Sequence, residues 1–283
     1  MQRLRFSTIV SCGLLVAAQA AAHDFWMAPG EYSIAPRGFV EIAFQVGDHG
    51  AAQRSQLPRS RIVRFATVGP RGASLDLREH LREPAAAYDA RLQIDAPGTH
   101  LIVLESDNRA RSDLPADVFN AYIDDEGLTL AQEHRQRANR MSEPASERYS
   151  RCAKVLVQVG ADDALSSQHV TTPVGLPLEI VLLSNPYSER AGERLPVRVI
   201  YRNRALGGAL VKVTDLEAGS VVERRRTNAA GDLEVQWPRS GRWMLSVVWS
   251  EPLASHEEVE FETVFSTLSF GFAERVSLAI DVP

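Results

Sequence analysis

Short segments of alternating apolar and polar residues recur along most of this chain and restrict it to a mainly β fold. The segment 39–47 places Val40, Ile42, Phe44 and Val46 on one side and mostly polar residues on the other. This period of two is typical of a strand with one buried face. Hydrophobic residues make up 45% of the 283 residues, which is enough for the large core that such strands require.

Further candidate strands follow, separated by turn residues. In the first half they are 61–69, the two parts of 88–106 around a Pro-Gly turn, and 153–160. In the second half they are 178–183, 195–202, 209–215, 221–227, 232–238, 242–250 and 261–272. This closely spaced second series predicts an immunoglobulin-like or transthyretin-like sandwich.

One segment breaks the β pattern and divides the first half. Residues 115–141 carry apolar side chains at helical spacing, with Gly127 between two expected helices. We therefore expect a first β-sandwich over 23–165 with a helical insertion at 115–141. A second sandwich is expected over 166–283, and the polar run 161–168 is the expected linker.

The segment 227–247 is similar to the hairpin of carboxypeptidase-regulatory-like and related prealbumin-type modules. Asn228 and Gly231 suit a tight turn between two strands, because both residues tolerate left-handed backbone angles. A turn of this kind is architectural, so it predicts a fold and no chemistry.

The first 22 residues predict a secretory signal peptide. Arg3 and Arg5 precede a short apolar run, and Ala20 and Ala22 provide an A-x-A cleavage site. Cleavage after Ala22 leaves His23 as the first residue of a mature periplasmic protein. An alternative interpretation takes "IVSC" at 9–12 as a lipoprotein signal with Cys12 as the lipidated residue.

Charge and cysteine content exclude several classes of protein. The formal charge of −5 offers no basic surface for nucleic acid, and the mature chain has no apolar run long enough to span a membrane. After signal cleavage Cys152 is the remaining cysteine, so no intramolecular disulfide is expected. Its place at the start of an apolar strand favours a buried, unreactive thiol.

The chain resembles a bacterial family of exported proteins labelled nickel-uptake substrate-specific, or NikM-like. The matching segments are 22–29, 120–128, 147–160, 174–187, 195–213, 227–245 and 266–270. The resemblance implies a periplasmic, metal-handling partner of a membrane importer for cobalt or nickel. Two features depart from it: no transmembrane part is present, and the histidine that relatives often carry near Trp249 is missing.

His23 at a mature N-terminus has a specific chemical use. Its α-amine and imidazole have ordinary pKa values of about 7.7–8.0 and about 6.5, so both can be neutral donors near neutral pH and can chelate one ion. A second imidazole would complete a histidine brace suited to Cu(II) or a nitrogen site suited to Ni(II). We expect His49 to be that ligand, because "QVGDHG" ends a strong strand and Asp48 adds a carboxylate.

The other histidines are weaker candidates. His100 shares a strand face with apolar residues and is expected to be structural, whereas His80 and His134 are expected to face solvent. His169 and His256 lie in segments with loop-like composition. No H-x-H, HExxH or CxxC spacing occurs.

These observations favour a non-enzymatic accessory protein that handles Ni(II), Co(II) or Cu(II). The sequence has no nucleophile elbow and no phosphate-binding loop. Two alternatives stay open at this point: a non-catalytic interaction module without metal, and a histidine-brace copper oxidase.

Overall fold

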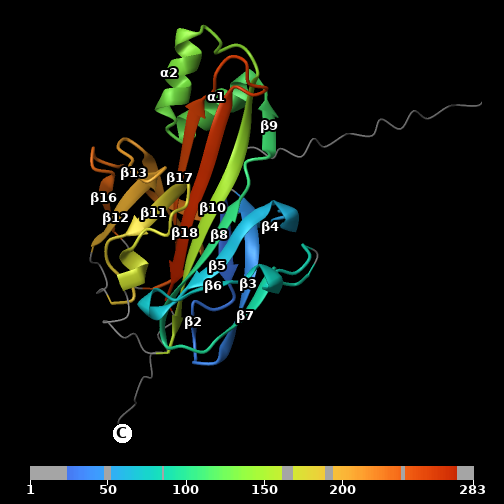
Figure 1. Ribbon diagram of the computed structural model, residues 1–283. Coiled ribbons are helices and arrows are strands. Elements are labelled where there is room, and N and C mark those ends of the chain that lie inside the picture. Colours follow the sequence, from blue (N-terminus) through green and yellow to red (C-terminus); the bar gives the residue numbers. More distant parts are fainter. Residues whose placement is uncertain are drawn as a thin grey trace, which may run out of the picture.

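The computed structural model describes residues 24–47, 52–84, 86–160, 168–188, 194–236 and 240–272. Within these ranges the chain is mainly β, with three sheets and a small helical insertion (Figure 1). The fold class expected from the strand pattern is therefore confirmed. None of the described helices combines the length and hydrophobicity needed to cross a membrane.

The central sheet contains strands from both halves of the chain. Its strands are β2 (Ser33–Ile34), β5 (Ile62–Val68), β6 (Ser74–Asp76), β8 (Gly98–Ser106), β9 (Ala110–Leu114), β10 (Ala145–Val159), β14 (Leu210–Asp215), β15 (Ser220–Arg226), β17 (Arg242–Pro252) and β18 (Phe261–Gly271). Their main order is β15-β14-β17-β18-β10-β8-β5-β6, and β2 and β9 also pair with β10.

Two smaller sheets and two α-helices complete the described structure. The first small sheet contains β1 (Asp24–Pro29), β3 (Gly38–Gly47), β4 (Gln53–Arg54) and β7 (Ala90–Ile94). The second contains β11 (Leu178–Leu182), β12 (Arg194–Tyr201), β13 (Arg204–Ala205) and β16 (Asp232–Gln236). The helices are α1 (Ala116–Asp125) and α2 (Thr129–Arg137), and short 3-10 turns occur at 59–61, 70–72, 78–80 and 168–171.

The two halves of the chain meet where β10 pairs with β18. The pairing is parallel and runs from Glu147 opposite Phe261 to Val155 opposite Ser269. Figure 1 shows β10, β17 and β18 as long neighbouring strands, with the helices at one end. The strands of the two expected domains are thus hydrogen-bonded into one sheet, a connection that the strand pattern alone did not predict.

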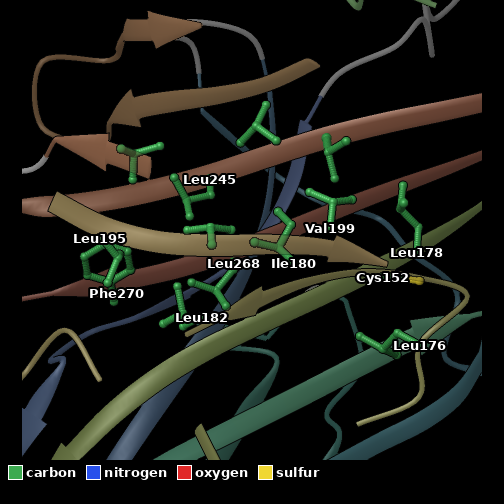
Figure 2. Close-up of a cluster of buried hydrophobic side chains, with 14 of the residues drawn as sticks. Cys152, Leu176, Leu178, Ile180, Leu182, Leu195, Val199, Leu245, Leu268 and Phe270 are labelled. Carbon is green, nitrogen blue, oxygen red and sulfur yellow. The ribbon is translucent and has the colours of Figure 1, made fainter. Parts of the chain in front are cut away.

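One face of the central sheet packs against the sheet of β11, β12 and β16, and we call it the sandwich face. Its β10 contributes Cys152 and Leu156 to a large apolar core that also includes Ile180, Leu245 and Leu268 (Figure 2). Cys152 is therefore a core residue, as expected. Its burial raises the pKa of the thiol to about 12, which makes it unreactive.

The opposite face of the central sheet, here called the helix-side face, is covered in two parts. Near one end, Ala153, Val155 and Val157 of β10 pack under the sheet of β1, β3 and β7. Near the other end, Phe261 and Phe265 of β18 contact α1 and α2. The β1 strand also lies across β10 and β18.

The expected strands and helical insertion agree with the structure, but one local interpretation was wrong. β10 begins at Ala145, before the expected strand 153–160, and its first residues pair with β9 and β18. The turn at Asn228–Gly231 is present, with Gly231 at φ +76°. It joins β15 in the central sheet to β16 in the second small sheet, so it is an arch between layers and no hairpin.

We expect Phe44→Ala to lower the free energy of unfolding by about 3–5 kcal/mol, because it leaves a cavity in the core. Phe44 is fully buried and makes edge-on contacts with Phe25 and Phe65, at centroid distances of 5.7 and 6.0 Å. Phe39 of the same strand is half-exposed. Phe39→Ala is therefore the matched control, and equal losses in denaturant titrations would contradict this assignment of the core.

Candidate functional site

A small pocket lies beside the start of β1 on the helix-side face. It encloses about 150 Å³ and is lined by Asp24 and Trp26 of β1, Gly47 of β3, Thr214 of β14 and Met244 of β17. Ala52 and the loop 216–219 complete its wall. We call this cavity the β1 pocket.

Hydroxyl groups of the central sheet fix β1 in place. Thr267 and Ser269 of β18 donate hydrogen bonds to the carbonyl groups of Phe25 and Met27, at 2.7 and 2.9 Å. The hydroxyl of Ser246 on β17 donates to Oδ2 of Asp24 at 3.1 Å. Because these bonds hold both the backbone and the first side chain of β1, the pocket wall is set by the sheet beneath it.

Strand pairing brings to this pocket the described residues that are nearest in sequence to the two expected metal ligands. Asp24 is the register partner of Gly47, and both residues line the pocket together with Ala52. In the sequence, His23 directly precedes Asp24, and His49 lies between Gly47 and Ala52. His23 and His49 themselves lie outside the described residues.

Thr214 gives the pocket an unsatisfied polar atom. Its side chain is 5% exposed, and its Oγ1 has no hydrogen-bond partner among the described residues. A buried hydroxyl without a partner costs free energy, so a bound ligand or ligand-bound water would stabilise it. The neighbouring Met244 is buried and presents a thioether, a soft donor.

A buried ion cluster lies behind the pocket. Nζ of Lys212 donates to Oε1 of Glu126 at 2.6 Å and to Oδ2 of Asp125 at 2.9 Å. Burial lowers the pKa of Lys212, but the carboxylates of Glu126 and Asp24 outweigh that effect and the net shift is upward. Burial raises the pKa of Glu126, and Lys212 opposes the shift. The cluster therefore connects α1 to β14 and reaches Asp24 electrostatically.

Arg151 of β10 contributes a second cation near Asp24. Its guanidinium lies 5.3–5.4 Å from the ring centroids of Phe25, Tyr149 and Phe265. Such cation–π contacts stabilise a charge that has lost water. Burial lowers the pKa of Arg151, and Tyr149 and Asp24 counteract the shift.

Glu147 extends the polar band along β10. Its Oε2 accepts a hydrogen bond from the Thr263 hydroxyl at 2.6 Å, and that hydroxyl lies 2.9 Å from the Ser250 hydroxyl. Glu147 is almost fully buried, and burial raises its pKa to about 7.

No described histidine lines the β1 pocket. His100 is buried, with Nε2 2.8 Å from the carbonyl of Ala96, and burial lowers its pKa, consistent with the expected structural role. His169 was expected in a loop but is also buried, with Nε2 2.7 Å from the carbonyl of Thr99. His134 is partly exposed and lies edge-on to Phe261.

His80 and His256 are exposed, which agrees with their polar surroundings in the sequence. Across the described residues, no group of three His, Cys, Asp or Glu side chains is arranged to hold a metal ion. A metal site at the β1 pocket would therefore need donors from outside the described residues, where His23 and His49 lie.

Sequence reasoning missed the buried ions. Lys212 lies between Val211 and Val213 and has the position of a solvent-facing residue in an alternating strand. Asp125 at the end of α1 is half-exposed but also binds Lys212. The available signal was in β18, where Thr263, Thr267 and Ser269 share a face with phenylalanines, a composition that predicts polar contacts on a buried face.

A family model described as a domain of unknown function, DUF4198, matches residues 20–251. The chain belongs to this family. The match includes the helices, the two small sheets and the central sheet up to β17, and it ends before β18. All residues that line the β1 pocket lie within it. Among proteins of curated function, none matches the sequence.

Solved structures show only distant likeness to this DUF4198 protein. The D0–D1 domain of intimin aligns at 13% identity over 88% of this chain and 98% of its own length, with a TM-score of 0.21. Salmonella alpha-2-macroglobulin reacted with methylamine aligns at 9% identity over 87% of this chain and 14% of its own, with a TM-score of 0.25. The human OSCAR ligand-binding domain aligns at 10% identity over 86% and 95%, with a TM-score of 0.20. These scores are too low to support an inference about function.

We expect Lys212→Met to lower the free energy of unfolding, and the loss to grow toward about 3–5 kcal/mol as the pH rises above about 8, because the Glu126 carboxylate is then buried without its cation. The loss should be smaller at pH 5, where Glu126, whose pKa is raised to about 8 and rises further without Lys212, is protonated in both proteins. Arg224→Met is the control, since Arg224 is partly exposed and pairs with Asp125 at 3.3 Å. Its loss should stay under about 1 kcal/mol, and a pH-independent loss at Lys212 would contradict the assignment.

Glu147 predicts a specific pH dependence of stability. Its pKa rises from about 4.5 when unfolded to about 7 when folded, so the folded state binds more protons between these values. Stability should therefore fall as pH rises from about 4.5 to 7, by up to about 3 kcal/mol from this group. In Glu147→Gln that fall should be reduced by this amount in urea titrations at pH 5 and pH 8; an unchanged pH profile would contradict the prediction.

Proposed function

We propose that this DUF4198 protein is a periplasmic accessory protein of transition-metal uptake or handling, and that it binds Ni(II), Co(II) or Cu(II) through a mature N-terminal His23. The observation that carries the proposal is the lining of the β1 pocket. Asp24, Gly47 and Ala52 all line it, and these are the described residues closest in sequence to His23 and His49.

The chemistry of the available donors is compatible with these ions. The α-amine and imidazole of His23 and the imidazole of His49 would supply nitrogen donors, which suit copper and nickel. Asp24 offers a carboxylate within the same pocket wall and Thr214 a buried hydroxyl without a described partner. The bound ion would later pass from these donors to the ligands of an importer, as metal delivery requires.

The polar surroundings of Asp24 support a role in holding the start of β1. Ser246 holds one carboxylate oxygen, and Arg151 and Lys212 lie close enough to interact with it electrostatically. These groups hold the Asp24 carboxylate in one orientation. Since His23 is its immediate neighbour in sequence, this support favours a positioned N-terminal donor. The resemblance to nickel-uptake proteins supports the same assignment and suggests a membrane metal importer as the partner.

The decisive experiment compares two forms of the mature chain 23–283. One has a free α-amine on His23, and in the other that amine is acetylated. We expect calorimetry with Cu(II) and Ni(II) at neutral pH to give one tight site in the free form and affinity reduced by more than about 100-fold in the acetylated form, because the chelate ring of amine and imidazole is lost. Equal binding by the two forms would contradict the proposal.

Substitutions separate the second ligand from general surface binding. His49→Ala should weaken binding of the free form, whereas His256→Ala, which removes an exposed histidine elsewhere, should leave it unchanged. Nitrogen couplings in the electron paramagnetic resonance spectrum of the Cu(II) form should fall in number with His49→Ala. Absence of metal binding in both forms favours the interaction-module alternative, and peroxide-driven oxidation of a polysaccharide by the Cu(II) form favours the copper oxidase.

A further inference from the structure

A second and larger pocket lies on the sandwich face of the central sheet. It encloses about 590 Å³, within the range of pockets that hold small molecules. Its floor is formed by residues of four neighbouring strands, β5, β8, β10 and β18, and its walls by the segments 106–108, 175–177 and 202–203. We call it the sandwich-face pocket.

Two of the acidic side chains in this pocket are already neutralised. Glu262 accepts hydrogen bonds from Asn108 at 2.8 Å and from Arg202 at 3.0 Å. Asp107 pairs with Arg61 at 2.9 Å and also with Arg109. These charges form a fixed polar wall and offer little net attraction to a ligand.

Glu105 on the pocket floor differs from them. Its side chain is partly buried, and among the described residues no hydrogen bond or ion pair engages its carboxylate. Burial raises the pKa of Glu105, and the nearby positive charge of Arg64 does not outweigh this effect. Arg64 directs one of its N–H groups to the carbonyl of Val174 at 2.8 Å. The floor therefore carries a partly desolvated carboxylate that a cation would stabilise.

Apolar side chains surround this carboxylate. Val63 is 48% exposed, although it lies on a strand at the floor of the pocket. Leu176, Pro177 and Val264 also line the cavity. A ligand that joins a cationic group to a short hydrocarbon chain would satisfy both kinds of surface.

The turn that forms one wall is preorganised. Arg202 and Asn203 both have left-handed backbone angles, with φ of +48° and +61°. Arg202 has a large side chain in a conformation that such residues rarely adopt. Its guanidinium bonds to Glu251 and Glu262, both at 3.0 Å, which holds the turn over the pocket.

We propose that the sandwich-face pocket binds a small organic cation, an alkylammonium or alkylguanidinium group of the kind carried by polyamines and basic side chains, with Glu105 as its counter-ion. A metal ion is disfavoured there, because no group of three metal-binding side chains occurs among the described residues. Charge-assisted hydrogen bonds from the cation to Glu105 would supply affinity, and the apolar residues would contact its methylene groups. The proposal is independent of His23.

The test uses two ligands of equal length and different charge, cadaverine and 1,5-pentanediol, titrated into the mature chain by calorimetry. We expect saturable binding of cadaverine below about 10 mM and none of the diol over the same range. Glu105→Gln should weaken cadaverine binding by at least about tenfold. Glu133→Gln, on the exposed face of α2, is the matched control and should bind like the unmodified protein.

Thermal unfolding of Glu105→Gln shows whether the variant is folded; because it removes a partly buried charge, we expect an unchanged or higher Tm. Chemical-shift changes in the unmodified protein, recorded at Val63 and Val264 on adding cadaverine, provide a readout in the pocket itself. Equal binding of the diol, unchanged cadaverine affinity in folded Glu105→Gln, or the absence of binding at about 10 mM would each overturn the proposal.

Discussion

The parallel pairing of β10 with β18 is the contact on which the rest of the molecule depends. It runs from Glu147 to Val155 and joins a strand of the first half of the chain to the last described strand. Parallel strands cannot be joined by a short hairpin, and here the connection is the whole of the second small sheet with β14, β15 and β17. Pairing β10 with β18 therefore closes a long loop of the chain and creates both faces on which the smaller sheets pack.

Burying β1 on the helix-side face has a cost that the polar residues of that face offset. Lys212, Glu126 and Asp24 are buried. Each of these charged groups loses water on folding, a cost that an apolar side chain in the same place would not have. Buried ion pairs add little net stability compared with apolar replacements, but removing one partner is expensive. These pairs consequently hold α1, β14 and β1 in one arrangement, and we regard this specificity as their physical role beside the β1 pocket.

The sequence predicted strands far better than it predicted their assignment to sheets. Alternation over 39–47 reports which residues are buried, and the structure has strands there and in the apolar segment 261–272. Alternation does not report the partner strand, because many registers bury the same face. Asn228–Gly231 illustrates this limit: its turn geometry is local and was predicted, whereas the placing of β15 and β16 in different sheets depends on long-range packing. Lys212 was missed for a related reason, since a charge between two valines normally marks a solvated face.

Differences in strand length explain why cavities occur on both faces. β10 has 15 residues and at about 3.3 Å per residue spans roughly 50 Å. β11 has five residues and β1 has six, so neither small sheet can cover its face from end to end. The part of the central sheet that the small sheets leave uncovered is covered by turns and loops. Their backbone and polar side chains line the cavities between them and the sheet. On the helix-side face the uncovered part of the sheet is occupied by α1, α2 and the buried ions beside the β1 pocket. On the sandwich face it is occupied by the Arg202–Asn203 turn, which lies over Glu105. A long shared sheet with short covering layers thus produces two separate cavities with polar linings, one on each face.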